Sequence, residues 1–380
     1  MNKILIFSAG RSDFGLLLPI INILKKNHDI QLAISSQHLD KRFGSTIKEI
    51  KDNKIKVAYK NKEILKNTGL DSIFSYFSKS TLEYYFFLKK KKPKAIFVLG
   101  DRYEVYSFVI PAYFLNIPII HMHGGELTLG AFDDGIRHSI SKFSNLHFVI
   151  NDSYKKRLIN MGEDPKTVFN FGSTGAEKIK LTKFVNKKIL YRKYKFKFDK
   201  SILITFHPET KSEVKLEDQI KCLLEALSRF CNYNLIFTSS NSDTQGIYFN
   251  KQVLKFKMRY DNVHIINNMG QRTYWNFLKN SSVVVGNSSS GIIEAPCIGI
   301  PTLNIGNRQQ GRIYSKSIYH SKINKNEIIR KLNNILNKKK IKYSNNFYKP
   351  KAAENIAKEI IQFLKKKIVN KKFYDIKKLY

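Results

Sequence analysis

The sequence predicts an α/β protein with two Rossmann-like, doubly wound domains that face a central cleft. Short apolar runs alternate with helix-like stretches along both halves of the chain, and this alternation is typical of parallel sheets covered by helices. With 380 residues, the chain is also long for a single hydrophobic core. We place the first domain at residues 1–172 and the second at 173–350. Residues 351–380 are predicted to form a terminal helix and tail that pack back on the first domain.

The first half contains apolar runs of strand length, with helical periodicity in the stretches that follow them. The predicted strands are 3–8, 30–35, 95–99, 117–121 and 146–149. The predicted helices are 15–26, 43–50, 71–90, 103–114, 136–143 and 153–161.

A second α/β cycle begins after Gly172-Ser173-Thr174-Gly175, and the basic segment 187–200 is predicted to be a linker with a short helix. The predicted strands are 202–206, 234–238, 263–266, 283–286 and 301–305. The predicted helices are 216–229, 250–257, 271–278 and 292–296. The apolar residues of 352–369 also follow helical spacing, which predicts the terminal helix.

The charge balance is unusual, with 67 Lys and Arg residues against 30 Asp and Glu. Such a surplus attracts polyanions. Much of it, however, lies in lysine runs such as Lys89–Lys92 and Lys371-Lys372, at predicted helix ends or in loops, which favours a solvated surface. No zinc-finger, RNP-like or helix-turn-helix motif is present, so no specific nucleic-acid partner is expected. A weak electrostatic association with an anionic membrane surface stays open.

The cysteines and the apolar segments bear on location. Cys222, Cys231 and Cys297 are few and lack metal-ligand spacing, which favours a reducing compartment without disulfides or zinc. The start of the chain leads directly into the first predicted strand, so no signal peptide is expected. The most apolar window, 105–120, contains two prolines and is too short to span a bilayer. We therefore expect a cytoplasmic protein.

Titratable side chains concentrate after the predicted strand 117–121. His121-Met122-His123-Gly124-Gly125-Glu126 is followed by Asp133-Asp134-Gly135-Ile136-Arg137-His138. This is more ionisable chemistry than a buried segment tolerates without a purpose. Ligands of open α/β sheets bind at the carboxyl ends of the strands. The segment is therefore the leading candidate for a functional site, with a satisfied polar turn as the alternative.

Two other loops of the first half follow predicted strands. The segment Ser8–Gly15 opens a helix, and its small residues let the backbone approach a ligand closely. Its backbone amides and Arg11 therefore suit a phosphate. A tight strand-to-helix turn explains the segment equally well. Asp101 and Arg102 follow the strand 95–99. They are either a structural ion pair or part of the same site as the histidine-rich segment.

The second half carries a further set of polar strand ends. His207 precedes a proline, which suggests a fixed turn that aims the imidazole. In the segment 286–294, serine hydroxyls and backbone amides before a helix can hold a diphosphate, and Glu294, expected in the first helical turn, can accept ribose hydroxyls. The alternative is a serine-rich helix cap. Arg308, after the next strand, can reach the same ligand.

Together these motifs resemble the UDP-N-acetylglucosamine 2-epimerase family, in its hydrolysing, sialic-acid-pathway branch. The resemblance rests on Leu-Gly-Asp-Arg, His-Gly-Gly-Glu, Arg-His-Ser-Ile, His-Pro-Glu-Thr and Ser-Ser-Ser-Gly in this order. Non-hydrolysing members typically carry Gly-Asp-Thr and Glu-Ala-Gly-Leu-Arg where this chain has Gly100-Asp101-Arg102 and His123-Gly124-Gly125-Glu126. One departure lies in the first loop, where Ala9-Gly10 precedes Arg11 in place of glycine and a hydroxyl residue.

The resemblance implies a GT-B type fold, with UDP held mainly by the second domain, and a reaction without metal or cofactor. UDP-N-acetylglucosamine would lose UDP by anti elimination, and hydration of the 2-acetamidoglycal would give free N-acetylmannosamine for sialic-acid and surface-polysaccharide synthesis. Three alternatives stay open: the same reaction on UDP-2,4-diacetamido-2,4,6-trideoxyglucose toward legionaminic acid, a GT-B glycosyltransferase, and a basic polyanion-binding module without catalysis. Relatives also imply a homo-oligomer, either a dimer or a tetramer.

The C2 proton of such a sugar is not acidic, so a carboxylate base must act while UDP departs. Asp101, Glu126 and Asp133 match the family's catalytic acids, and Arg137 is expected to orient them. His207, the other residue expected to be catalytic, and Arg11 are expected to stabilise the diphosphate. The residues expected to bind the UDP-sugar are Arg11, Asp13, Arg102, His138, His207, Ser289, Ser290, Gly291, Glu294 and Arg308.

Overall fold

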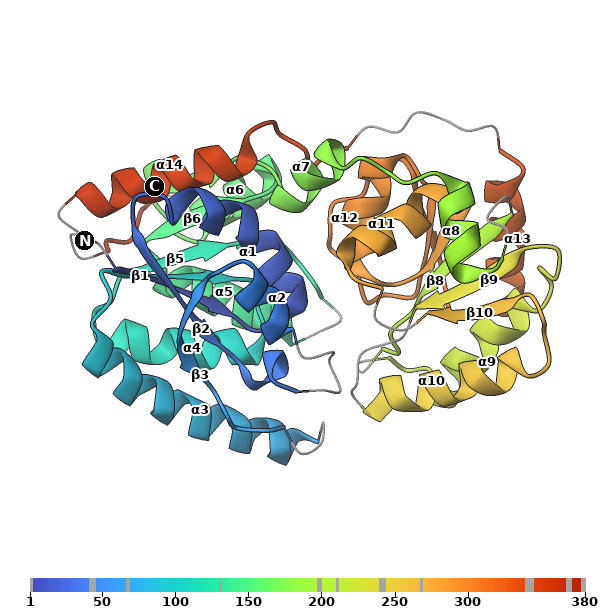
Figure 1. Ribbon diagram of the computed structural model, residues 1–380, viewed down its shortest axis with the longest axis horizontal. Coiled ribbons are helices and arrows are strands. Elements are labelled where there is room, and N and C mark those ends of the chain that lie inside the picture. The colour runs from blue at the N-terminus through green and yellow to red at the C-terminus, as the bar shows by residue number, and fades with distance from the viewer. Residues whose placement is uncertain are drawn as a thin grey trace. The chain divides into compact units, whose positions relative to one another are not determined.

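The computed structural model confirms the predicted α/β class, with two parallel sheets covered by helices (Figure 1). The structure describes residues 3–40, 46–65, 69–129, 132–196, 200–209, 212–238, 244–266, 269–338, 345–366 and 371–376. The chain divides into two compact units. Unit 1 comprises Met1–Glu126, Phe132–Glu177 and Phe347–Tyr380, and unit 2 comprises Leu127–Ala131 and Lys178–Asn346.

Unit 1 contains a seven-stranded sheet in the order β3-β2-β1-β4-β5-β6-β7, with parallel neighbours throughout. Its strands are β1 (Lys3–Ser8), β2 (Asp29–Ile34), β3 (Lys56–Lys60), β4 (Ala95–Leu99), β5 (Ile119–Met122), β6 (Leu146–Val149) and β7 (Val168–Asn170). Its helices are α1 (Arg11–Leu24), η1 (Ser36–His38), α2 (Ile47–Asp52), α3 (Leu70–Lys91), α4 (Tyr103–Phe114), α5 (Asp133–Phe143), α6 (Asp152–Asn160), η3 (Pro165–Thr167) and α14 (Ala352–Lys365). The boundary to unit 2 falls within α7 (Thr174–Leu181).

Unit 2 contains a six-stranded parallel sheet in the order β10-β9-β8-β11-β12-β13. Its strands are β8 (Ser201–Thr205), β9 (Asn234–Thr238), β10 (Val263–Ile266), β11 (Val283–Gly286), β12 (Thr302–Ile305) and β13 (Ile318–Ser321). Its helices are α8 (Lys187–Tyr194), α9 (Leu216–Leu227), α10 (Thr244–Lys257), α11 (Gln271–Asn280), α12 (Ser289–Ile298) and α13 (Lys325–Leu336). In both sheets the carboxyl ends of all strands therefore lie along one edge.

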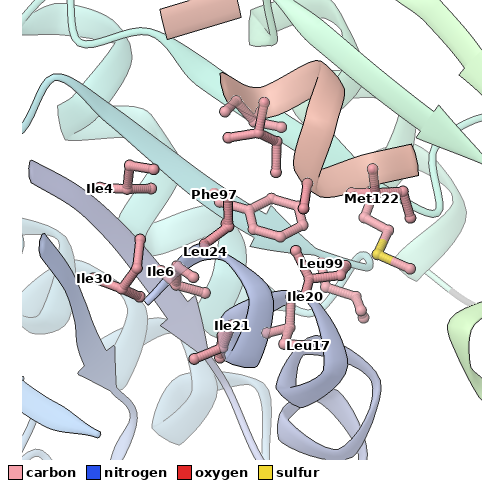
Figure 2. Close-up of a cluster of buried hydrophobic side chains, with 14 of the residues drawn as sticks. Ile4, Ile6, Leu17, Ile20, Ile21, Leu24, Ile30, Phe97, Leu99 and Met122 are labelled. Atoms are coloured by element: carbon pink, nitrogen blue, oxygen red, sulfur yellow. The ribbon is translucent and has the colours of Figure 1, made fainter. Parts of the chain in front are cut away.

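Side-chain alternation along β1 explains why helices cover both faces of the unit 1 sheet. Ile4 and Ile6 pack in a cluster with residues of α1 and α14, as Figure 2 shows for Leu17 and Ile20 of α1. Leu5 and Phe7 belong to the cluster on the opposite face, with residues of α3, α4 and α5. Each buried aliphatic side chain contributes roughly 1.5–3 kcal/mol, so the two clusters fix the strand ends from both sides.

Two predicted helices extend beyond the described residues. The helix expected at 43–50 corresponds to α2, which begins at Ile47, and its first three predicted residues lie outside the described ranges. The terminal helix expected at 352–369 is α14, which ends at Lys365, and residues 367–370 again lie outside. Across the ranges given above, no helix is long and apolar enough to cross a membrane.

The lysine runs differ in their surroundings. Lys89–Lys91 form the last turn of α3, where cations complement the helix dipole, and they are mostly exposed as expected. Lys371 is different, because its side chain is only partly exposed and its ammonium pairs with a buried carboxylate. Its ammonium lies 2.5 Å from the Glu163 carboxylate, and the lysine and glutamate side chains are 24% and 1% exposed. A carboxylate this deeply placed requires cationic partners.

Candidate functional site

The guanidinium of Arg137 joins three segments at the carboxyl edge of the unit 1 sheet. Arg137 lies on α5 and is 1% exposed. Its Nη2 donates to Oδ2 of Asp101, which follows β4 through Gly100. Its Nη1 donates to the backbone oxygen of Glu126 at 2.8 Å, in the loop after β5. A buried cation needs such partners. The bond from Arg137 in turn fixes the Asp101 carboxylate in place.

The loop after β5 is held in an unusual backbone conformation. His123 has a φ of 68°, which is uncommon for a residue with a side chain, and Gly125 has a φ of 75°. A Cβ on Gly125 would lie 2.5 Å from the Tyr154 backbone oxygen, so glycine is required there. The His123 ring lies with Nδ1 2.8 Å from Oε1 of the buried Glu126. Backbone strain of this kind concentrates at functional sites.

The first turn of α5 supplies two more carboxylates. Asp133 is the first residue of the helix and is half-buried, one turn before Arg137 on the same face. The next residue, Asp134, has Oδ1 3.6 Å from Nη1 of Arg137 and Oδ2 3.6 Å from Nε2 of His138. The sequence argument chose Asp133 and did not identify Asp134 as an ion-pair partner. Both carboxylates are favourable at the positive end of the helix.

Arg102 belongs to a different group of side chains from Asp101. Its Nη2 and Nε donate to the two carboxylate oxygens of Glu104 at 2.9 and 3.1 Å. The alternative of an Asp101–Arg102 ion pair is therefore wrong, because each residue has its partner elsewhere. Gln37 Nε2 also donates to Glu104 at 2.6 Å. Glu104 and Gln37 were not among the residues predicted for the site, although a glutamate in the apolar helix 103–114 was a usable signal.

Asp13 lies beside this group and is largely desolvated. Its Oδ2 accepts from the backbone N of Ala9 at 3.2 Å. Burial raises the pKa of Asp13, and the nearby Arg102 charge opposes that rise. Arg11 is more open to solvent, with a 43% exposed side chain whose Nε is 3.7 Å from Oε2 of Glu49 on α2. Residues 11–14, expected as a loop, form the first turn of α1, which begins at Arg11.

In unit 2, Asn287 organises the residues around the end of β8. Its side-chain oxygen accepts from the backbone N of His207 at 2.8 Å, and its Nδ2 donates to the His207 oxygen at 2.8 Å. Arg308 Nη1 and Gln309 Nε2 donate to the Asn287 backbone oxygen at 3.1 and 2.8 Å. Burial, aided by the Arg308 charge, lowers the pKa of His207 to about 3. The imidazole is therefore neutral and can offer a ligand a hydrogen bond rather than a charge.

The serine segment begins α12 earlier than expected. Gly286 has a φ of 138°, and a Cβ there would lie 2.0 Å from the Thr205 backbone oxygen. Ser288 is the N-cap of α12 and accepts from the backbone N of Ser290 at 3.4 Å, so the helix-cap alternative is correct for this one serine. Ser289 and Ser290 form the first turn, and the Ser290 hydroxyl is 2.7 Å from the Tyr274 hydroxyl. The positive end of such a helix favours anions.

Glu294 lies in the second turn of α12, not in the first, because the helix starts at Ser289. Burial raises the pKa of Glu294 to about 7, with Trp275 and Lys178 lowering it in part. Lys178 itself lies with Nζ 5.7 Å from the Trp275 ring centroid and donates to Gln271 Oε1 at 2.8 Å. The carboxyl group thus changes protonation near neutral pH.

The predicted residues therefore form groups within each unit. Asp101, Glu126 and Arg137 meet in unit 1, while Asp13 and Arg102 form a second group beside them. In unit 2, His207 and Arg308 are joined through Asn287. Ser290 lies on the same helix as Glu294. The sequence contained Asn287 within its serine motif. It offered no sign that both the oxygen and the nitrogen of the side-chain amide form structural hydrogen bonds.

Comparison with known proteins identifies the family. The profile described as UDP-N-acetylglucosamine 2-epimerase matches residues 22–361. The polysialic acid biosynthesis protein P7 of Escherichia coli is 38% identical, with 99% of this chain and 98% of that protein covered. A GDP/UDP-N,N'-diacetylbacillosamine 2-epimerase (hydrolysing) of Campylobacter jejuni is 39% identical over 85% of each chain.

Solved structures agree in fold. A UDP-GlcNAc 2-epimerase from Methanocaldococcus jannaschii, crystallised with UDP-GlcNAc and UDP, superposes with a TM-score of 0.78 at 21% identity. The match covers 95% of this chain and 100% of that one. This similarity confirms the predicted GT-B type of fold. On the profile match and the two curated relatives, the chain belongs to the UDP-N-acetylglucosamine 2-epimerase family of enzymes.

Proposed function

We propose that this protein is a hydrolysing 2-epimerase that converts UDP-N-acetylglucosamine and water into free N-acetylmannosamine and UDP. The observation that carries the proposal is the group around Arg137. One buried guanidinium binds the Asp101 carboxylate and the backbone of Glu126, so two acids from separate loops are held together. A fixed cluster of acids is what a reaction at an unactivated C–H bond needs.

The proposed reaction has two steps, an elimination and a hydration. A carboxylate removes the C2 proton, the C–H electron pair forms the C1=C2 double bond, and UDP departs with the electron pair of the C1–O bond. Water then adds its oxygen to C1 of the 2-acetamidoglycal and gives one proton to a carboxylate. The electron pair of the C1=C2 double bond takes a proton at C2, on the face opposite to the one that lost the original proton, so C2 is inverted. Asp101, Glu126 and Asp133 are the acids and bases of these steps, and Arg137 orients them.

Residues of unit 2 are proposed to bind the UDP group. The start of α12, at Ser289, Ser290 and Gly291, is proposed to face the diphosphate, because the positive end of a helix favours an anion. Arg308 adds positive charge, and neutral His207 adds a hydrogen bond. Glu294, when ionised, accepts from ribose hydroxyls. The similar enzyme from Methanocaldococcus jannaschii, crystallised with UDP-GlcNAc and UDP, supports a UDP-sugar as ligand.

A second substrate is favoured by a specific observation. The Campylobacter jejuni relative named for N,N'-diacetylbacillosamine is 39% identical, about as similar as the Escherichia coli polysialic acid protein at 38%. N,N'-diacetylbacillosamine is the 2,4-diacetamido-2,4,6-trideoxy sugar, which differs from N-acetylglucosamine at C4 and C6. The two reactions are identical at C1 and C2, so the acids around Arg137 serve both.

Proton NMR in D2O distinguishes these substrates. The purified protein is incubated separately with UDP-N-acetylglucosamine and with the UDP-2,4-diacetamido-trideoxy sugar, with Asp101→Asn as the matched control. A free manno-configured product carrying deuterium at C2, formed from the first substrate and absent with the control, supports the proposal. Turnover of the second substrate alone reassigns the sugar. Release of UDP with unepimerised sugar contradicts the elimination mechanism.

A further inference from the structure

His121 connects two segments that carry proposed catalytic residues. It lies near the carboxyl end of β5 and is 0% exposed. Its Nε2 is 2.8 Å from the backbone oxygen of Gly100, the residue directly before Asp101. Its Nδ1 is 3.1 Å from Oγ of Ser141, which lies on α5 one turn after Arg137. We call these two contacts together the His121–Ser141 joint.

The chemistry of the partners fixes the state of the ring. A carbonyl oxygen can only accept, so the Gly100 contact requires the proton on Nε2. Nδ1 then accepts from the Ser141 hydroxyl. Burial lowers the pKa of His121 to about 3, in line with this neutral form. The Ser141 hydroxyl also lies 3.0 Å from the Arg137 backbone oxygen, so one proton serves either the ring or the helix.

The loop that carries Glu126 passes close to the same joint. A Cβ on Gly124 would lie 2.7 Å from Oγ of Ser141 and 3.1 Å from Nδ1 of His121. Glycine at 124 therefore allows the loop to approach the joint, and any larger residue must displace it. The segments bearing Asp101, Glu126 and Arg137 thus converge on one buried imidazole.

We propose that His121 is a positioning residue for epimerisation, acting through Gly100 and Ser141 to set the placement of Asp101 against Arg137. The inference rests on the proposed function, because the importance of this placement depends on the acids acting in catalysis. His147 provides a contrast on the neighbouring strand, paired in register with His121 and equally buried. Its Nε2 is 2.9 Å from Oε2 of Glu163, so it serves a structural ion-pair network instead.

The test compares His121→Gln and Ser141→Ala with the matched control His147→Gln. A misplacement of about 1 Å in a catalytic group can reduce the rate about 100-fold. We expect both test variants to lower kcat by roughly 10- to 100-fold, with KM changed less than about 3-fold. The double variant should lose no more than about the worse single variant, since both act through one contact. His147→Gln should lower the melting temperature while kcat stays within about 3-fold of wild type.

Separate outcomes bear on the two proposals. If the wild-type protein turns over neither UDP-sugar, the proposed function is wrong. If wild type is active and folded His121→Gln or Ser141→Ala keeps its kcat, the positioning role is wrong. Should His121→Gln fail to fold, Ser141→Ala decides alone, because it removes a single oxygen atom. Histidine 15N NMR of the wild type gives an activity-independent check: a proton on Nδ1 instead of Nε2 overturns the joint.

Discussion

The ammonium of Lys371 lies 2.5 Å from the carboxylate of Glu163 and also donates to backbone oxygens at the end of α5. Those oxygens belong to Ser141, Lys142 and Ser144, at 3.2, 2.7 and 2.8 Å. The contacts satisfy carbonyl groups that a helix end leaves unpaired. A tail residue thus stabilises the helix that carries Arg137.

Replacing Lys371 tests this contribution to stability. Lys371→Met removes one of three cationic or hydrogen-bonding partners of Glu163 and three hydrogen bonds to α5. We expect a loss of about 1–3 kcal/mol in the free energy of unfolding, since Glu163 keeps Lys142 and His147. Urea unfolding measures it. The neighbouring Lys372→Met, at an exposed position, is the control; equal losses in both variants would contradict the assignment.

The ion pairs of Glu163 should make the stability of the fold depend on pH. Burial alone would raise its pKa, but His147, Lys142 and Lys371 outweigh burial and lower the pKa to about 2. Because this folded-state pKa is below the ordinary 4.5, the stabilisation is complete above pH 4.5 and is lost as the pH falls toward 2. The stability difference between wild type and Glu163→Gln, on the order of 3 kcal/mol at most, should therefore shrink on acidification. A difference that stays constant from pH 6 to pH 3 would argue against it.

Glu294 should respond in the opposite direction. Its folded-state pKa is raised to about 7 from 4.5, chiefly by burial, so ionisation destabilises the fold as the pH rises between these values. Glu294→Gln should therefore melt at a higher temperature than wild type at pH 8.5, with little difference at pH 4. The same variant should bind UDP more weakly at pH 8.5 by calorimetry, if the carboxylate accepts ribose hydroxyls. Equal melting temperatures at pH 8.5 would refute the stability argument.

Two adjacent acids at the start of α5 should differ in their effect on turnover. Asp133 matches the proposed catalytic acid, whereas Asp134 pairs with Arg137 and His138. We expect Asp133→Asn to lower kcat by about 100-fold or more, as should Asp101→Asn and Glu126→Gln. Asp134→Asn should cost less than about 10-fold in kcat and lower the melting temperature slightly. Steady-state kinetics on folded variants measures this, and the reverse ranking would move the catalytic role to Asp134.

Gly286 and Gly299 form a matched pair for unit 2. Both have positive φ, but a Cβ at Gly286 would lie 2.0 Å from the Thr205 oxygen, whereas nothing lies within 4 Å at Gly299. Gly299→Ala should cost about 1 kcal/mol for backbone strain alone. Gly286→Ala should cost several times as much, because the backbone at Thr205 or at Gly286 must shift to make room for the Cβ. Equal melting temperatures of the two variants would show that the strand end tolerates a Cβ.

The sequence predicted the central strands well and missed three of the four edge strands. Three strands were not predicted, β3, β7 and β13, and each lies at the edge of its sheet. A central parallel strand is buried on both faces and shows a continuous apolar run, as β4 does. By contrast β3 reads Lys-Val-Ala-Tyr-Lys and has no buried residue. The missed edge strands lack a strong apolar signal because they lack the burial that causes it, whereas the edge strand β10 keeps an apolar run and was predicted.

The candidate site was predicted by residue type better than by geometry. The sequence identified Asp101, Glu126 and Arg137, which the structure joins. It could not show that Arg102 pairs with Glu104 rather than Asp101, because pairing depends on side-chain direction after the strand ends. It placed the start of α12 three residues late, at 292, since Ser289–Gly291 have weak helix propensity. The helix begins there because Ser288 caps it.

Burial of α14 has a consequence for the order of folding during synthesis. Ile356, Ile360 and Leu364 of this helix belong to the same core as Ile4 and Ile6 of β1. The ribosome therefore releases the first strands long before the helix that covers them. The contiguous stretch Lys178–Asn346 of unit 2 is complete earlier. Premature termination within α14 would leave the N-terminal strands, which are synthesised first, with uncovered apolar surface that chaperones and proteases can bind.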